Sequence, residues 1–385
     1  MAERSFIPLS VPVLCGNEKK YVDHCLDTGW ISSVGEFVNR FEKEFASYTG
    51  AAHAVAVVNG TSALHLALLV AGVKPGEEVL VPALTFIAPI NAVTYAGAVP
   101  VFLDVEEETM GLSPSSFEEF VASSCELRDG ILFNRSTGRR ITALLPVHIY
   151  GHACRMSALL PLARKYGMIL LEDAAEAIGT LCDGCHAGTI GSIGSFSFNG
   201  NKTLTTGGGG MLVTNDEAYA KRLRHLSTQA KSDELYYRHD EIGYNYRMSN
   251  VQAAIGVAQL ESFPAALERK RGIHAHYERE FCKLPLSLFG EAPWCRSNYW
   301  MAVLTLSQEM GVRDRFMAHM NGCGIQARPL WDLNNRHPMY CGNPCAALPV
   351  SEKLYDRCVC IPCGQHMSDG DVERVISAVR GFFGS

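Results

Sequence analysis

A single lysine, Lys202, lies between two apolar runs that could fix an amine for chemistry. It follows the alternating run Ser195–Phe198 and precedes four glycines, residues 207–210, that lead into the run Met211–Thr214. Flanking strands would hold the backbone of this lysine in place. A fixed and partly desolvated amine can lose its proton near neutral pH and attack a carbonyl carbon. An ordinary surface lysine in a hairpin loop explains the same stretch, so Lys202 alone does not decide between the two.

A carboxylate, Asp173, follows the apolar run Met168–Leu171, which is typical of a strand buried on both faces. In open α/β sheets, ligands bind at the carboxyl ends of the strands, so Asp173 lies where a bound cofactor is expected. A carboxylate there can keep a pyridinium nitrogen protonated, which makes a pyridoxal ring an electron sink. Taken by itself, Asp173 is also a good helix N-cap.

Two hydroxyl side chains, Thr61 and Ser62, follow Gly60 after the apolar run Ala54–Val58. They open an expected helix whose free N–H groups and dipole favour a bound anion such as phosphate. Simple helix capping explains the same two residues. This strand is not followed by Gly-x-Gly-x-x-Gly or by Gly-Lys-Ser/Thr, which argues against a dinucleotide site and a P-loop.

These three sites belong to a longer series of motifs that extends over nearly the whole chain. The motifs are Gly-Trp-Ile-Ser-Ser at 29–33, Asn-Gly-Thr-Ser-Ala-Leu at 59–64, Pro-Ala-Leu-Thr-Phe-Ile-Ala at 82–88, Pro-Val-His-Ile-Tyr-Gly at 146–151, Glu-Asp-Ala-Ala-Glu-Ala at 172–177, the Lys202 loop, Gly-Tyr-Asn-Tyr-Arg-Met-Ser at 243–249 and Ala-Arg-Pro-Leu-Trp at 327–331. In this order, the chain resembles the DegT/StrS group of sugar-nucleotide aminotransferases, which are fold type I enzymes that use pyridoxal 5'-phosphate (PLP).

The resemblance implies an α/β fold of the fold type I PLP transferases. It predicts a large PLP-binding domain over residues 1–260, with a mostly parallel seven-stranded sheet flanked by helices, and a smaller α+β domain over residues 261–385. The residues themselves support this, because apolar runs alternate with helical patterns from residue 54 to about 230. Pro264 and a charged helix after it mark the expected change of domain. The expected strands cover residues 54–58, 79–81, 99–103, 143–147, 168–171, 193–198 and 211–214.

The resemblance also implies roles for individual residues. Lys202 would carry PLP covalently and move protons, and Asp173 would pair with the ring nitrogen. Glu176 would contact the ring hydroxyl, where the family often has an amide or imidazole, so a glutamate would have to be protonated or bridged by water. Asn245 would reach the phosphate from the neighbouring subunit of a homodimer with shared active sites, although an Asx turn also explains it. The expected cofactor-binding residues are Gly60, Thr61, Ser62, Phe86, Asp173, Glu176, Ser197, Lys202 and Asn245.

The expected reaction is transfer of the amino group of glutamate to C4 of a UDP- or GDP-linked 2-acetamido-2,6-dideoxy-4-ketohexose. Relatives with histidine in place of Lys202 perform dehydration, so the lysine favours amino transfer. Three alternatives stay open: a 3-keto sugar-nucleotide aminotransferase, a cysteine desulfurase, against which Phe86 speaks, and a non-catalytic PLP-binding regulator. Arg328 would bind a diphosphate or a carboxylate, or else form a surface ion pair. The expected substrate-binding residues are Trp30, Ser32, Ser33, His148, Tyr150, Tyr299 and Arg328.

The composition of the chain limits the classes of function and the location that we expect for it. The chain has 385 residues, 47% of them apolar, and a net charge of -6, which gives no indication of nucleic-acid binding. Because we find no signal region and no apolar stretch of membrane-spanning length, we expect a cytoplasmic protein without a membrane partner. Among 14 cysteines, Cys182 and Cys185 have the spacing of a redox or zinc pair, but Asp183-Gly184 between them is a two-residue hairpin turn. We therefore expect no metal.

Overall fold

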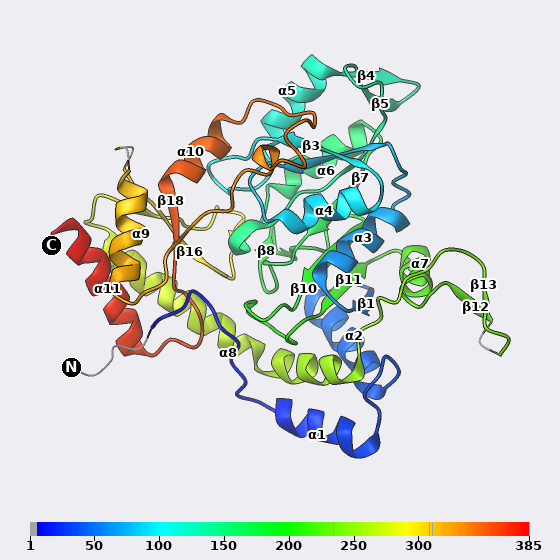
Figure 1. The fold of residues 1–385 in the computed structure, drawn as a ribbon, viewed down its shortest axis with the longest axis horizontal. Coiled ribbons are helices and arrows are strands. Elements are labelled where there is room, and N and C mark those ends of the chain that lie inside the picture. The colour runs from blue at the N-terminus through cyan, green and yellow to red at the C-terminus, as the bar shows by residue number, and fades with distance from the viewer. Residues whose placement is uncertain (1–5, 234, 308, 310, 385) are drawn as a thin grey trace.

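The computed structural model describes residues 6–233, 235–307, 309 and 311–384, and a seven-stranded sheet forms the centre of its larger region (Figure 1). The strands lie in the order β1-β11-β10-β7-β6-β2-β3. Strand β11 is antiparallel to both neighbours, whereas all the other neighbouring pairs are parallel. The mostly parallel sheet and its seven expected strands are therefore confirmed. Their bounds are β1 His53–Val57, β2 Glu78–Pro82, β3 Val99–Leu103, β6 Ile141–Leu144, β7 Ile169–Asp173, β10 Ile193–Ser197 and β11 Gly210–Thr214.

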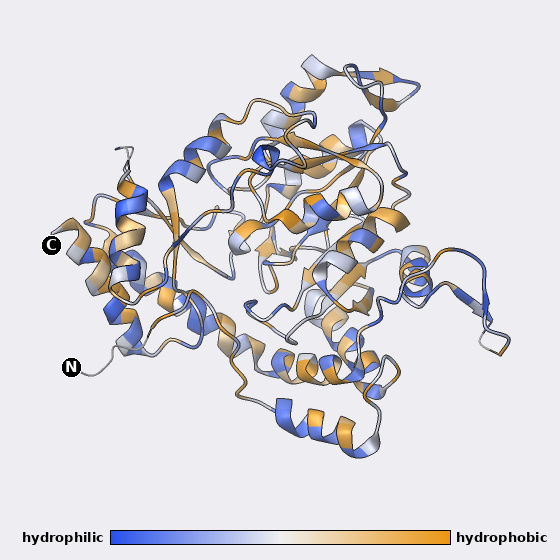
Figure 2. Ribbon diagram, viewed as in Figure 1, coloured by the Kyte–Doolittle hydropathy of each residue, from blue (hydrophilic) through white to orange (hydrophobic). Residues whose placement is uncertain are grey.

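Helices cover both faces of this sheet, which explains why its strands are apolar on both sides (Figure 2). On one face, alternate residues of the strands pack against α3 (Gly60–Val70), α4 (Ile87–Tyr95) and α7 (Glu217–Ser227). The residues between them pack on the other face. There they meet the helices α2 (Glu36–Thr49), α5 (Pro114–Ser124), α6 (Met156–Lys165) and α8 (Asn250–Phe281).

A smaller region surrounds an antiparallel sheet in the order β14-β16-β18-β17. Its apolar core includes residues of α9 and α11, and Ile7 from the start of the chain also packs there. The α+β character expected for the second region is therefore present. The bounds are β14 Ser287–Leu288, β16 Ala302–Thr305, β17 Arg328–Pro329, β18 Cys358–Ile361, α9 Val312–Gly322, α10 Pro349–Arg357 and α11 Asp369–Phe383.

Helix α8 links the two regions without a break. Pro264, which was expected to mark the change of domain, lies inside this helix. A proline in a helix interior costs about 3 kcal/mol. The helix continues because residues on both sides of the proline are buried. Val257 and Phe263 pack in the core under the large sheet, and Ile273 and Tyr277 pack in the second core. A division of the chain at residue 260 would cut this helix.

The remaining elements are short or peripheral. The strands β4 and β5 form a hairpin, and Cys182 faces Cys185 across another, as the turn predicts. The strands β12 and β13 form an arm that projects from the body (Figure 1). No helix within the described part of the chain has the length and apolarity needed to cross a membrane. The bounds are α1 Glu18–Thr28, β4 Cys125–Arg128, β5 Ile131–Asn134, β8 Leu181–Cys182, β9 Cys185–His186, β12 Lys231–Asp233, β13 Arg238–His239, β15 Cys295–Arg296 and the 3-10 helices Ile149–Gly151 and Asn334–Arg336.

Candidate active site

Most of the expected cofactor-binding residues line one cavity of about 300 Å³ at the carboxyl edge of the parallel strands. We call it the cofactor cavity. Its walls come from the first turn of α3, the last residues of β7 and β10 and the loops that follow these strands. Neighbouring parallel strands end at the same edge of a sheet, which is why residues far apart in the chain meet here. The expected residues in its wall are Gly60, Thr61, Phe86, Asp173, Glu176, Ser197 and Lys202.

The amino group of Lys202 lies between a carboxylate and an aromatic ring. Its Nζ is 3.2 Å from Oε1 of Glu176 and 3.9 Å from the centre of the Trp300 ring. The side chain of Lys202 is only 12% exposed, so the reading as a solvated surface lysine is wrong. The second oxygen of Glu176 accepts a 2.7 Å hydrogen bond from the amide of Tyr150, which fixes the carboxylate.

Asp173 ends β7 and is buried at the floor of the cofactor cavity. Burial raises the pKa of its carboxyl group to about 6, with nearby Glu176 adding to the rise and Lys202 opposing it. The group is therefore ionised at neutral pH. Its Oδ1 accepts a 3.0 Å hydrogen bond from the amide of Ala175. The next helix along the chain is α7, so Asp173 is not a helix N-cap and its position needs another explanation.

The first turn of α3 forms the opposite wall. The N-cap is Asn59, whose side chain accepts a 2.8 Å hydrogen bond from the amide of Ser62. The hydroxyl of Thr61 is thus not the cap, and Thr61 lines the cavity, whereas Ser62 is buried and does not. A side chain at Gly60 would place its Cβ 2.7 Å from the Cβ of Ser197, so only glycine allows this turn to approach β10. The amides of a first helical turn lack partners within the helix and suit a phosphate.

Three expected substrate-binding residues do not line either cavity of this chain, and their role in binding stays a prediction. His148 is fully buried: its Nδ1 accepts from the amide of Cys154, so its Nε2 donates to Glu172 at 2.9 Å. Tyr150 is also fully buried, and its hydroxyl accepts from the amide of Trp331. Tyr299 stacks on His274 with 3.6 Å between the ring centres. Tyr150 thus contacts the wall residue Trp331, and none of the three lines either of the two cavities described here.

Four other expected residues lie away from the cavity within their own chain. Trp30, Ser32 and Ser33 form the connection between α1 and α2, where Asn250 donates to the carbonyl of Trp30 at 2.7 Å. Trp30 is 57% exposed. Asn245 pairs with Thr228 in an isolated bridge beyond the β12–β13 arm. These residues could meet a ligand in this cavity only if a second copy of the chain supplied them.

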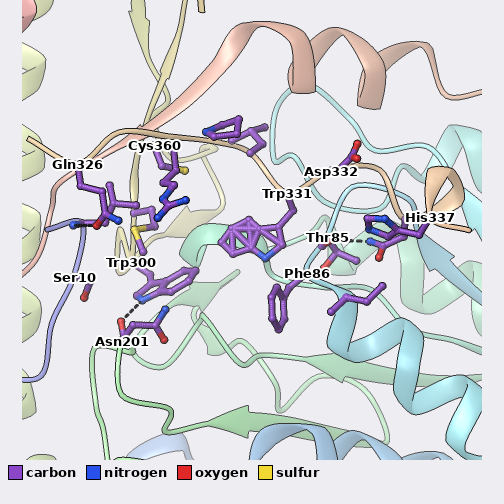
Figure 3. A pocket seen from close by; sticks show the side chains of 17 residues that line it. Ser10, Thr85, Phe86, Asn201, Trp300, Gln326, Trp331, Asp332, His337 and Cys360 are labelled. Carbon is purple, nitrogen blue, oxygen red and sulfur yellow. Dashed lines mark hydrogen bonds between the residues drawn. The ribbon is translucent and has the colours of Figure 1, made fainter. Parts of the chain in front are cut away.

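A second cavity of about 670 Å³ adjoins the first, and Phe86, Trp300 and Trp331 are among its wall residues (Figure 3). Arg328 also lines it. We call it the adjoining cavity. The two share the wall residues Thr85, Phe86, Asn201, Trp300 and Trp331. The Phe86 ring meets the edge of Trp331 with centres 5.9 Å apart. Thr85 Oγ1 and Trp331 Nε1 are buried without a hydrogen-bond partner among the described residues, so this shared wall offers polar atoms that a ligand could pair.

Sequence reasoning missed Trp300, Trp331 and Asn201 as wall residues. Trp331 lies inside the motif at 327–331, and Trp300 follows the expected residue Tyr299, but a sequence motif does not say which side chain faces the cavity. Tyr299 has a φ of 47°, and this left-handed residue turns its own ring away while the next ring, Trp300, enters the wall. The Asn201 carbonyl accepts a 2.9 Å hydrogen bond from Trp300 Nε1, a contact between residues nearly one hundred positions apart.

One group in the described ranges brings three possible metal-ligating atoms within 4.8 Å of one another: His225, Asp240 and Glu241. Arg222 forms an ion pair with Glu241, and His225 is hydrogen-bonded to Asp240 at 2.8 Å. Cys182 and Cys185 do not belong to this group.

A parallel sheet that presents a buried carboxylate, a lysine and a helix N-terminus to one cavity defines a fold type I PLP-binding site. The donor set fits the group: an anion beside a ring nitrogen, a hydroxyl and free amides for a phosphate, and an aromatic face for the ring. The chain belongs to the DegT/DnrJ/EryC1/StrS aminotransferase family, whose model matches residues 13–380. It is therefore a transaminase, and its cofactor is pyridoxal phosphate.

Individual relatives match over almost their full length. The chain is 38% identical to a GDP-perosamine synthase of Caulobacter vibrioides, covering 98% of this chain and 99% of the relative. It is 37% identical to a GDP-perosamine synthase of Vibrio cholerae, with the same coverage. Its fold matches the crystal structure of a DegT/DnrJ/EryC1/StrS aminotransferase from Brucella abortus with a TM-score of 0.87 and 28% identity, covering 96% of each chain.

Proposed function

We propose that this transaminase transfers the amino group of glutamate to C4 of a nucleotide-linked 4-keto-6-deoxyhexose, with GDP as the nucleotide. The observation that carries the proposal is the convergence of Lys202, Asp173 and Thr61 on one cavity that adjoins a larger one. The motifs of the sequence favour C4 of a keto sugar. Relatives that are 37–38% identical are named for a GDP-linked sugar, which favours GDP over UDP.

Each wall residue has a role in this reaction. Thr61, Ser197 and the first amides of α3 would hold the phosphate, and Asp173 would pair with the ring nitrogen while Phe86 covers the ring. PLP bound there supplies an electron sink that stabilises negative charge on the carbon bonded to the amino group. Lys202 would carry the cofactor covalently between turnovers. Once released, its Nζ would take up and return the proton at that carbon.

The adjoining cavity supplies room for the rest of the substrate. Its 670 Å³ is more than twice the volume of the cofactor cavity. The guanidinium group of Arg328 in its wall can bind a diphosphate or the carboxylate of glutamate through two parallel hydrogen bonds. The shared wall of Thr85, Phe86 and Trp331 would then separate the reacting carbon from the nucleotide.

A 2-acetamido group on the sugar, which the resemblance of the motif Asn298-Tyr299-Trp300 to the family implies, stays a prediction. Asn298 and Tyr299 of that motif are buried and line neither cavity, so nothing in the two walls favours an acetamido group over a hydroxyl group. The proposed acceptor is therefore defined by its 4-keto group and its nucleotide.

We also propose a homodimer in which Asn245 completes the site of the partner subunit. Asn245 lies outside the cavity of its own chain, next to an arm that exposes Leu235, Tyr236 and Tyr237 by 67–77%. Large exposed apolar side chains gathered on one projection indicate a contact surface. Mixing Lys202→Ala protein with Asn245→Ala protein after dissociation should restore partial activity, because one hybrid site would be intact. An active monomer, or no recovery after exchange, would refute the shared site.

A substrate panel tests the reaction. Glutamate should be converted to 2-oxoglutarate in the presence of a GDP-linked 4-keto-6-deoxyhexose, with a product mass that corresponds to exchange of oxygen for NH2 and gain of hydrogen. The panel includes the UDP-linked sugar, the 2-acetamido sugar and the 3-keto isomer, with Lys202→Ala as the inactive control. Amination of only the 3-keto sugar, or of no sugar nucleotide, would contradict the proposal.

A further inference from the structure

The indole ring of Trp300 is placed to act on Lys202. The Lys202 Nζ lies 3.9 Å from the ring centre, well within the range of a cation–π interaction. Trp300 is only 1% exposed, and it lines both the cofactor cavity and the adjoining cavity. The lysine therefore meets an aromatic face on one side and the Glu176 carboxylate, 3.2 Å away, on another.

Three hydrogen bonds, two to the backbone and one to the ring, fix the position of Trp300. Its amide donates to Oδ1 of Asn298 at 2.8 Å, and its carbonyl accepts from the buried Nζ of Lys270 at 3.1 Å. Its Nε1 donates to the carbonyl of Asn201, the residue directly before Lys202. The ring is thus tied to the backbone of the same loop whose lysine it faces.

The carboxylate side of the arrangement is tied to the same turn. The Asn298 side chain donates to the carbonyls of Glu176 and Ile178, each at 2.8 Å. A side chain at Gly151, which has a φ of +93°, would place its Cβ 1.9 Å from Asn298 Oδ1, so this packing requires glycine. Asn298 therefore joins the backbone of Glu176 to that of Trp300, and the two partners of the lysine belong to one rigid unit.

We propose that Trp300 and Glu176 form a lysine cradle, which holds the free ammonium group of Lys202 when the amine is not bonded to the cofactor. The proposal rests on the assignment of Lys202 as the cofactor lysine. The cradle would keep Nζ beside the cofactor cavity, so that the amine returns to the same place in each cycle. Trp300 is then a positioning residue, because it acts through Lys202 and not on the substrate.

In this proposal, the aromatic face of Trp300, and not only the volume of its side chain, holds the ammonium group of Lys202. A cation–π contact in a desolvated site changes an equilibrium by roughly five- to thirtyfold. The contact acts on the charged ammonium group, so it holds Nζ against the ring and limits the access of reagents to it. Replacing Trp300 should therefore make Lys202 easier to modify chemically, even in protein that holds no cofactor.

Two substitutions distinguish the effect of an aromatic ring at position 300 from the effect of side-chain volume. Trp300→Phe keeps an aromatic face, whereas Trp300→Met fills similar space without one, and both lose the Nε1 hydrogen bond to Asn201. In cofactor-free protein at neutral pH, reductive methylation with formaldehyde and a borane reductant is followed by peptide mass analysis at Lys202. Trp294→Leu serves as the control, because Trp294 also lies under a cation, Arg155 at 4.6 Å, but lines neither cavity.

We expect Lys202 to be methylated about five- to thirtyfold faster in Trp300→Met than in the native chain, and within about threefold of the native rate in Trp300→Phe. Trp294→Leu should leave the rate unchanged. Equal rates in the Phe and Met variants would overturn the cradle. If Trp300→Met fails to fold, as judged by circular dichroism, Glu176→Gln replaces it: an unchanged rate there would also overturn the proposal.

A kinetic readout accompanies the chemical one. In the loaded enzyme, Trp300→Met should lower kcat for glutamate with little change in KM, and Trp300→Phe should rescue part of the loss. Failure of the cradle differs from failure of the site assignment. If borohydride fixes the cofactor to Lys202 while the methylation rates are all equal, only the cradle is wrong.

Discussion

The two cavities that meet at Phe86 and Trp331 are built in different ways. The cofactor cavity is walled by the ends of β7, β10 and α3. These elements are fixed in place because their apolar residues must pack in the core. The adjoining cavity is walled by segments near residues 9–10, 85–87 and 326–337, which include the short strand β17 and a 3-10 helix and come from both the larger and the smaller region. In the proposed function, the chemistry takes place at the edge of the large sheet, and the nucleotide and sugar are bound by segments outside that sheet.

The charged groups of the two cavities differ in the same way. Asp173 is only 3% exposed, whereas Arg328 has an exposed side chain. A charge in a desolvated site interacts more strongly with its partner than a charge that water can reach. Changes in the cofactor cavity should therefore have the larger effects on turnover, and changes in the adjoining cavity should act on substrate affinity.

The largest effect is expected from Asp173→Ala. Removing a charge partner of the cofactor ring should lower kcat by about 10²–10³ while the fold is kept. Steady-state kinetics and circular dichroism check both parts. Glu78→Gln is the matched control, because Glu78 is another fully buried carboxylate that bonds only structural partners, among them Asn134 at 3.0 Å. Turnover within a few fold of the native enzyme would contradict the assigned role of Asp173.

A pH dependence follows from the same residue. Burial raises the pKa of Asp173 to about 6, so the carboxylate is present above that pH and is neutralised as pH falls through it. Cofactor affinity of the apoenzyme should therefore weaken below about pH 6, and equilibrium titration at pH 5 and pH 8 measures this. Because the raised pKa favours protonation of the folded state, Asp173 contributes less to the free energy of unfolding as pH rises from 4 to 6. Asp173→Asn should show neither dependence, and an unaltered pH profile in that variant would refute the attribution.

A smaller effect is expected from Arg328→Ala. Loss of a charge-assisted hydrogen bond should raise KM for one substrate by roughly tenfold to a hundredfold and leave kcat within a few fold. Separate titrations of glutamate and of the sugar nucleotide show which substrate it binds. Arg296→Ala is the control, because Arg296 forms an exposed ion pair with Glu268 and lines neither cavity. A loss in kcat alone would mean that Arg328 acts in the chemical step. The proposed division of roles between the two cavities would then be wrong.

The smallest effect is expected from the cysteine pair. Cys182 and Cys185 face each other across a hairpin, outside both cavities. Cys185→Ser, and a chelator together with a reductant, should leave activity unchanged. Zinc in stoichiometric amount after purification without added metal would contradict this expectation.

The large sheet could be predicted from local apolar runs in the sequence, whereas the roles of the cofactor-cavity residues were implied by the resemblance of motifs spread over the whole chain. Apolar runs define the strands, and their carboxyl ends place Asp173, Ser197 and Lys202 at one edge. The continuation of α8 past Pro264 could not be foreseen, because it depends on cores at both ends of the helix that form only in the folded chain.

The adjoining cavity and its neighbours were predicted less well. The motifs around His148 and Tyr299 suggested contact with substrate, yet both side chains turn into the core, where Glu172 and His274 hold them. The direction of a side chain in an irregular segment depends on backbone angles such as the positive φ of Tyr299, which residue patterns do not reveal. Trp300 therefore lies in the wall of the two cavities, and the predicted residue Tyr299 does not.

One measurement tests the central claim that the cofactor cavity is the reaction centre. The purified enzyme is reduced with borohydride, digested, and its cofactor-bearing peptide is identified by mass. We expect a single modified peptide that carries the cofactor on Lys202, and no modified peptide from Lys202→Ala. A cofactor fixed to any other lysine, or a reducible adduct that persists in Lys202→Ala, would contradict it.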